Sequence, residues 1–126
     1  MSAIEHALSL EDRSALKRAC SELSLEILDS LQIAPIRLKV LTVRPRNNWG
    51  ELHGEYEPAE GRRRALVTVW MRTAHHKNVV AFRTFLRTVL HELCHHIDYE
   101  LFKLEDSFHT EGFFKRESSL FKQLVQ

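Results

Sequence analysis

The sequence predicts an α+β fold, and three observations lead to this prediction. Apolar residues recur at three- and four-residue spacing in two long segments, which is the period of amphipathic helices. Between these segments lie short runs rich in β-branched residues and bounded by Gly, Pro and Asn, as is typical of strands and turns. The 126 residues contain no internal repeat or low-complexity segment, so we expect a single domain over residues 1–126.

The first half of the chain predicts an N-terminal helix followed by strands. Ser9 with Asp12 resembles a capping box, and apolar residues follow at helical spacing until the chain approaches Pro35. We expect a strand over residues 36–43, a turn over 44–48, a shorter strand within 50–58 and a strand over 66–71. These strands should form a small, mostly antiparallel sheet.

A second long helix is predicted to begin after Asn78, which is a suitable N-cap. Its apolar stripe consists of Phe82, Leu86, Val89, Leu90, Leu93, Cys94, Ile97 and Leu101. A separate polar face carries Thr84, Thr88, His91 and His95 at regular helical spacing. A final helix is expected over residues 112–124.

Residues 91–95 read His-Glu-Leu-Cys-His, an H-E-x-x-H sequence inside the predicted helix. Histidines four residues apart lie on the same helical face, so two imidazoles can reach one metal ion. Glu92 between them is placed to act on a water molecule at that ion. The motif therefore predicts His91 and His95 as Zn²⁺ ligands, Glu92 as the catalytic base, and hydrolysis of a peptide bond as the reaction.

A catalytic zinc site has three protein ligands and keeps one position for water, so a further ligand is required. Downstream of the helix, His109 and Glu111 are both candidates. The metzincin pattern is excluded because it needs a histidine where Leu101 stands. We expect His109, because imidazole is the commoner zinc ligand in such a setting, with Glu111 as the alternative.

An H-E-x-x-H helix followed by a second helix that opens with His109 and then Phe113 resembles the SprT-like zincins. The resemblance covers roughly residues 50–125. That family usually has Gly after the third histidine, whereas this chain has Thr110. The small minigluzincins are also similar in size and layout, and their third ligand is a glutamate, which keeps Glu111 open.

This resemblance implies a zincin-like domain with an edge strand beside the cleft, and the activity of a zinc metalloendopeptidase. Residues 66–71, with Val67, Val69 and Trp70, are expected to be the edge strand that pairs with an extended peptide or protein substrate. Val67 and Val69 are also expected to pack in the core.

A second electrophile should stabilise the developing oxyanion, and Tyr, His or Arg usually serves. The candidates in this chain are Tyr56, Tyr99 on the active helix, and the adjacent His75 and His76 in the preceding loop. The sequence does not choose among them.

Composition sets further expectations. The 18 Lys and Arg residues balance 17 Asp and Glu residues, and Arg62–Arg64 reads as a solvated turn, so we expect no nucleic-acid partner. Cys20 and Cys94 fall on apolar helical faces and should be buried free thiols. Because no signal peptide or membrane-spanning run is visible, a cytoplasmic location without membrane association is expected.

The short C-terminal segment leaves room for a different functional class. Only 17 residues follow His109, so a single helix must form the lower wall of the cleft. The alternative function is therefore a latent or inactive zinc-binding interaction module, with or without an association with DNA. An intact Glu92 favours the enzyme, because a closed structural site does not need a carboxylate base.

Overall fold

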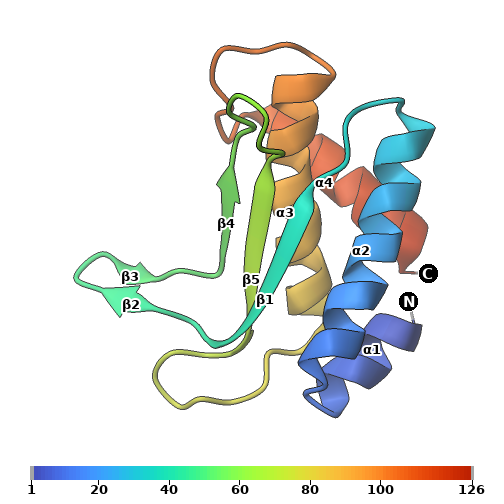
Figure 1. The fold of residues 1–126 in the computed structure, drawn as a ribbon. Coiled ribbons are helices and arrows are strands. Elements are labelled where there is room, and N and C mark those ends of the chain that lie inside the picture. Colours follow the sequence, from blue (N-terminus) through green and yellow to red (C-terminus); the bar gives the residue numbers. More distant parts are fainter. Residues whose placement is uncertain (1, 126) are drawn as a thin grey trace.

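The computed structural model describes residues 2–125 and shows an α+β fold, as the sequence predicts (Figure 1). The elements in chain order are α1 (Ser2–Ser9), α2 (Arg13–Ser30), β1 (Arg37–Val43), β2 (Arg46–Asn47), β3 (Gly50–Glu51), β4 (Gly54–Glu57), β5 (Leu66–Arg72), α3 (Phe82–Glu100) and α4 (Glu111–Leu124).

The main sheet has three strands in the order β1-β5-β4. β5 runs parallel to β1, with Val40 opposite Val69, and antiparallel to β4, with Tyr56 opposite Val67. β2 and β3 form a separate antiparallel hairpin that projects away from the body of the molecule (Figure 1). Most of the strand pairings are therefore antiparallel, as expected, and the β1–β5 pair is the parallel one.

The prediction that residues 66–71 form the edge strand is wrong. β5 is the central strand of the sheet, and the edge on the side of α3 is formed by β4. Val67 and Val69 are fully buried, in agreement with their expected packing role, and Trp70 is only 7% exposed. A strand that is buried on both faces reads as a nearly continuous apolar run, and Leu66–Met71 has this composition.

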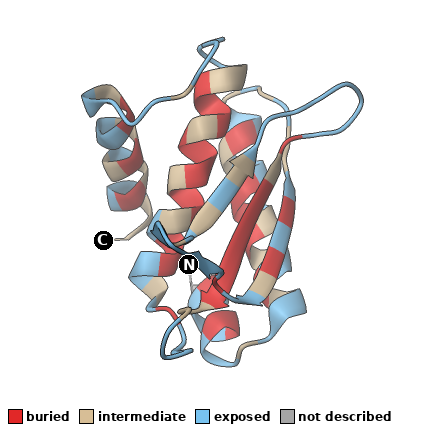
Figure 2. Ribbon diagram, turned by 90° about the vertical axis from the view of Figure 1, so that its left-hand side faces the viewer, coloured by how far each residue is buried: buried red, intermediate tan, exposed pale blue. Residues whose placement is uncertain are grey.

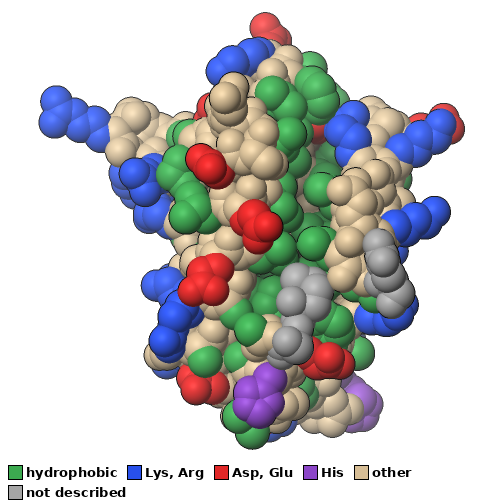
Figure 3. All heavy atoms as spheres, turned by 90° about the vertical axis from the view of Figure 1, so that its right-hand side faces the viewer, with side chains coloured by type: hydrophobic (Ala, Val, Ile, Leu, Met, Phe, Trp, Pro, Cys, Tyr) green, Lys and Arg blue, Asp and Glu red, His purple; other side chains and the backbone are tan. Residues whose placement is uncertain are grey.

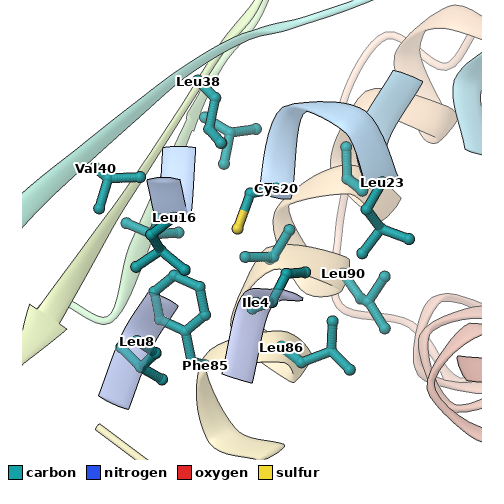
Figure 4. Packing of buried hydrophobic residues seen from close by; sticks show 14 of the residues in the cluster. Ile4, Leu8, Leu16, Cys20, Leu23, Leu38, Val40, Phe85, Leu86 and Leu90 are labelled. Carbon is teal, nitrogen blue, oxygen red and sulfur yellow. The ribbon is translucent and has the colours of Figure 1, made fainter. Parts of the chain in front are cut away.

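One face of the sheet packs against the helices and forms the core. Leu38 and Val40 of β1 point into it, whereas Lys39 between them is exposed, which is the alternation of a half-buried strand. Figure 2 shows β5 buried along most of its length. Figure 4 shows α1, α2 and α3 contributing to the same cluster through Ile4, Leu8, Leu16, Cys20, Leu23, Phe85, Leu86 and Leu90. Burying each large side chain of this kind stabilises the fold by roughly 1.5–3 kcal/mol.

The N-terminal helical segment is split, so the Ser9 capping box is wrong. Ser9 is the last residue of α1, where its hydroxyl donates to the His6 carbonyl. The N-cap of α2 is Asp12, whose Oδ1 accepts from the backbone N–H of Ala15 at 3.1 Å. Glu11 between the two helices adopts a positive φ of 53°, which breaks the helical path.

The long helix α3 begins later than the sequence predicts. Its N-cap is Ala81, not Asn78, and the cap has no side-chain hydrogen bond. Asn78 instead closes the β5–α3 loop through its carbonyl, which accepts from the backbone N–H of Thr73, and Val80 N–H donates to Met71. The predicted apolar stripe of α3 is otherwise buried from Leu86 to Ile97, while Leu101 lies just past the helix end and is 39% exposed.

Cys20 and Cys94 are buried and free, as expected. Burial raises the pKa of each thiol to about 12, so neither is a nucleophile at neutral pH.

The face shown in Figure 3 carries charged side chains around a strip of hydrophobic ones between helices. None of the helices within residues 2–125 combines the length and the apolar character that crossing a membrane requires.

Candidate metal centre

The long helix α3 places His91 and His95 side by side. Their ring centroids are 5.1 Å apart, as expected for residues one helical turn apart. Both side chains are partly exposed, whereas Glu92 between them is buried. The helical spacing of the motif therefore produces the arrangement that the sequence predicts.

His109 completes a three-histidine cluster from the segment that precedes α4. Its Nε2 lies 3.1 Å from His91 Nε2 and 3.2 Å from His95 Nε2. Zinc–nitrogen bonds of about 2.0–2.1 Å at tetrahedral angles place two ligand nitrogens roughly 3.3–3.4 Å apart, close to these separations. His91, His95 and His109 thus lie close enough to bind one metal ion.

The other ring nitrogen of each α3 histidine has a partner of its own. His91 Nδ1 lies 2.6 Å from Glu117 Oε1, and His95 Nδ1 lies 2.7 Å from Ser107 Oγ. A neutral imidazole that donates from Nδ1 carries its lone pair on Nε2. Both partners therefore favour the tautomer that presents Nε2 to the centre of the cluster, as such partners do in metal sites.

These partners belong to two side-chain networks that tie α3 to the C-terminal part of the chain. Ser107 Oγ donates to Asp98 Oδ2 at 2.6 Å, and the Arg116 guanidinium donates to Asp98 Oδ1 at 2.7 Å. On the other side, Glu117 accepts from Arg87 Nη1 at 3.2 Å. Each network is anchored by a buried carboxylate, because Asp98 is 1% exposed and Glu117 is 6% exposed.

Electrostatics favour the neutral form of His95. Burial, with His91 and His109 close by, lowers the pKa of His95 to about 4. Its imidazole is therefore neutral at physiological pH, as a metal ligand must be. The buried Phe113 ring lies against all three histidines, at centroid distances of 5.0 Å from His91, 4.7 Å from His95 and 5.2 Å from His109.

Glu92 lies beside the cluster under the edge strand β4. Burial raises its pKa to about 7, and the neighbouring carboxylates of Glu55 and Glu117 add to this rise. The backbone of β4 comes close because residue 54 is a glycine: a Cβ there would lie 3.0 Å from Glu92 Oε2 and 2.7 Å from Thr88 Cγ2. A carboxyl group with a pKa near neutrality can both accept and release a proton at physiological pH.

A cavity of about 360 Å³ opens over the histidines. It is lined by Gly54, Glu55, Tyr56, Pro58, His91, Glu92, His95, Tyr99, Ser107 and His109. Residues from β4, from α3 and from the segment before α4 therefore line the same cavity. Such a concave site with a few convergent polar groups is the usual form of a ligand-binding or catalytic site.

Tyr56 and Tyr99 are brought to this cavity, and their rings stack at 5.9 Å. The Tyr56 hydroxyl lies 2.7 Å from Nδ1 of the buried His96, whose Nε2 lies 2.7 Å from the Ala34 carbonyl. Since Nε2 must donate to the carbonyl, Nδ1 accepts from Tyr56. Burial, with Glu100 and Tyr99 nearby, also raises the pKa of Tyr56, so its hydroxyl stays protonated.

The other candidate stabilisers lie elsewhere. His75 and His76 are exposed in the loop between β5 and α3, at the N-terminal end of the helix, and do not line this cavity. His91 lies nine residues after Phe82, which is about 14 Å along the helix axis. We therefore do not assign them to the site.

Glu111 does not join the cluster. Its side chain is 84% exposed and forms an ion pair with Lys115 at 3.1 Å on the outer surface of α4. It is the first residue of α4, directly after the N-cap Thr110, whose hydroxyl accepts from Phe113 N–H at 3.1 Å. Among the residues that the structure describes, His109 is the one that meets the two α3 histidines.

Several contributors to the site were not predicted from the sequence, among them Glu117, Ser107 and Gly54. Glu117 could have been found, because it lies between Phe113 and Phe121 at four-residue spacing, and an acid in an apolar stripe needs a buried partner. The roles of Ser107 and Gly54 depend on contacts with distant parts of the chain and have no local sequence signal.

Comparisons with protein-family models, with curated proteins and with solved structures find no match to this chain.

Proposed function

We propose that this protein is a zinc-dependent peptidase whose metal is held by His91, His95 and His109 and whose general base is Glu92. The observation that carries the proposal is the convergence of three Nε2 atoms beside a buried glutamate. This combination is the one that the resemblance to the SprT-like zincins implies. A purely structural zinc site would not need the glutamate.

The donor set fits zinc. Imidazoles are borderline-soft ligands, and two of the three are oriented through Nδ1 by Glu117 and Ser107. When bound, zinc polarises a carbonyl oxygen and lowers the pKa of coordinated water toward neutrality. His109 is exposed, so one side of the cluster is open to substrate.

In this mechanism Glu92 is the group that accepts and then donates the proton. Its carboxylate takes a proton from the attacking water and passes it to the leaving amine as the peptide bond breaks. The raised pKa suits both steps, since the group loses and regains a proton near neutral pH. Tyr99 is the candidate to hydrogen-bond the developing oxyanion, because the Tyr56 hydroxyl already donates to His96.

The substrate is proposed to bind along β4 rather than along β5. β4 pairs with β5 on one side, and its opposite edge is the edge of the described sheet. An extended peptide added at this edge would run past Gly54 and Glu55, which line the cavity over the histidines. Main-chain hydrogen bonds would then hold substrates of varied sequence.

Metal analysis combined with cleavage assays tests the proposal. We expect one zinc per chain after purification without chelator, and cleavage of denatured casein that stops on chelation and returns with zinc. Glu92→Gln should retain zinc and abolish cleavage, because it removes a base and not a ligand. His109→Ala should weaken zinc binding strongly and abolish cleavage.

The control is Glu111→Ala, which should keep both zinc and activity, because Glu111 is exposed and paired only with Lys115. Release of zinc in this variant but not in His109→Ala would make the carboxylate the third ligand. Zinc binding without any Glu92-dependent cleavage would favour the alternative, a zinc-binding interaction module. Absence of zinc, even after it is added back, would overturn the proposal.

A further inference from the structure

A second cavity, of about 480 Å³, adjoins the metal centre on the side of Glu117. Its lining consists of His53, Gly54, Arg83, Thr84, Arg87, Thr88, His91, Glu92, Phe114, Glu117 and Phe121. His91, Glu92 and Gly54 line both this cavity and the one over the histidines. A peptide that reaches the metal centre therefore has this second space directly beside it.

The guanidinium groups of Arg83 and Arg87 bring positive charge to the lining of this cavity. They are one helical turn apart on α3, so they lie along the same wall. Among the ion pairs within residues 2–125, none involves Arg83. Arg87 donates to Glu117 and lies over the Phe121 ring at 4.1 Å from its centroid.

The anionic groups of the lining are already engaged in the site. Glu117 accepts from Arg87 with one oxygen and contacts His91 Nδ1 with the other. Glu92 lies at the inner end, under Gly54. The outer end holds the positive charge of Arg83, and the Arg87 guanidinium keeps further N–H donors beyond the one used by Glu117.

The distances along α3 from Glu92 to Arg87 and Arg83 suit a substrate side chain next to the scissile bond. Glu92 lies five residues after Arg87, which is about 7.5 Å along the helix axis, and Arg83 lies one further turn away. Phe114 and Phe121 supply apolar surface for the methylene groups of such a side chain. The cavity is larger than one side chain needs, so its charge and not its size should provide the selectivity.

We propose that this cavity, the arginine pocket, receives an acidic side chain of the substrate, with glutamate preferred, next to the bond that is cleaved. The inference rests on the proposed function for its catalytic part, but peptide binding alone can test the pocket. Arginine suits this role because its planar fork binds carboxylates with two hydrogen bonds.

The binding test uses Glu92→Gln protein, loaded with zinc, and two labelled degenerate peptide pools that differ only in a central Glu or Gln. Fluorescence anisotropy should show the Glu pool binding about fivefold more tightly at low salt. The difference should shrink at high salt, because exposed charges are screened. Arg83→Glu should abolish or reverse the preference.

The matched control is Arg18→Glu, an exposed arginine on α2 that lines neither cavity, which should leave the preference unchanged. Arg83→Lys should keep part of the preference, since the charge remains and the fork is lost. Equal binding of the two pools, or a preference that survives Arg83→Glu, would overturn the inference.

A cleavage test separates this inference from the proposed function. Wild-type protein incubated with a complex peptide mixture should produce cleavage sites enriched in Glu at one position beside the scissile bond, as read by mass spectrometry. Glu92-dependent cleavage without this enrichment would refute the arginine pocket and leave the peptidase intact. A Glu preference in binding with no cleavage would support the pocket and refute the peptidase.

Discussion

Gly54 on the edge strand and Glu92 on α3 are in direct contact: a Cβ at position 54 would lie 3.0 Å from Glu92 Oε2 and 3.2 Å from its Cγ. The missing side chain lets the strand backbone cover the carboxyl group, which is buried as a result. This contact couples the proposed substrate-binding edge to the proposed base, so a change at residue 54 should affect the chemistry before it affects the metal.

Gly54→Ala is expected to lower cleavage at least about tenfold while zinc content stays at one per chain. The new methyl group must displace Glu92, Thr88 or β4, and a small misplacement of a reacting group is costly. Overpacking of this kind should also lower the free energy of unfolding by about 1–3 kcal/mol. Peptidase kinetics, metal analysis and urea denaturation measure the three effects.

The matched control is Gly112→Ala in the first turn of α4. A Cβ there meets the far end of the Arg116 side chain at 3.3 Å, which can move, and Thr110 Oγ1 at 3.8 Å, which is an ordinary van der Waals contact. Activity and zinc content should remain those of the wild type. If Gly54→Ala behaves like this control, the contact with Glu92 has no role in catalysis.

Glu117→Ala is expected to weaken zinc binding about 10- to 100-fold, because His91 loses the partner that orients its ring. Competition with a chromophoric chelator measures the affinity. Glu111→Ala on the same helix provides the reference, since its carboxylate is exposed, pairs with Lys115 and is not part of the histidine cluster. Unchanged affinity in Glu117→Ala would show that packing against Phe113 alone orients His91.

The buried Glu92 should make the metal-free protein less stable as pH rises. Its pKa is 4.5 in the unfolded chain and about 7 in the folded protein, so the folded state holds the proton more tightly. The contribution of the protonated Glu92 to the free energy of unfolding is fully present below pH 4.5. This contribution is lost as the pH rises through the folded pKa near 7. Glu92→Gln keeps a neutral side chain and should avoid this loss.

Urea denaturation in chelator, over the pH range from about 4.5 to 7.5, checks this expectation. The stability advantage of Glu92→Gln over the wild type should grow with pH by up to about 3 kcal/mol. The contribution of His95 is present in both proteins and cancels in the comparison. An advantage that stays constant with pH would mean that Glu92 ionises normally in the folded state.

Nucleic-acid binding should be negligible at physiological ionic strength. Arg62–Arg64 are exposed, but Glu57 and Glu60 lie on the same part of the surface and Arg63 approaches Glu60 at 4.0 Å. Such mixed charge does not form a continuous phosphate-binding surface. Submicromolar DNA binding that weakens steeply with salt, and that is lost when the three arginines are replaced, would contradict this expectation.

Local patterns predicted the long helices, though not the split between α1 and α2 or the start of α3, and they predicted the face of α3 that carries the histidines. The H-E-x-x-H spacing fixes the positions of His91, Glu92 and His95 once α3 forms, because helical geometry alone decides it. For the proposed third metal ligand, the sequence offered two nearby residues, His109 and Glu111. The structure distinguishes the two residues by their positions at the start of α4. His109 precedes the N-cap and lies against the histidines of α3, whereas Glu111 is the first residue of α4 and lies on its outer face.

Strand order was not predictable in the same way, because it depends on pairing between distant segments. β5 was expected at the edge because it precedes α3 in sequence, yet β4 occupies that place. The composition held a signal: Leu66–Met71 is apolar almost throughout, whereas β4 alternates Gly, Glu, Tyr and Glu. The helix start at Ala81 was missed because Asn78 is used to close a loop.

Because His109 lies outside α3, a metal ion bound at the proposed site would also have a mechanical role. An ion shared by His95 and His109 would close a loop of 15 residues, with both histidines counted, and this loop contains the exposed Leu104 and Phe108. In polymer terms the ion acts as a reversible crosslink that lowers the entropy of the unfolded chain. Chelation should therefore loosen the junction between α3 and α4, so that a protease cuts first between residues 101 and 110.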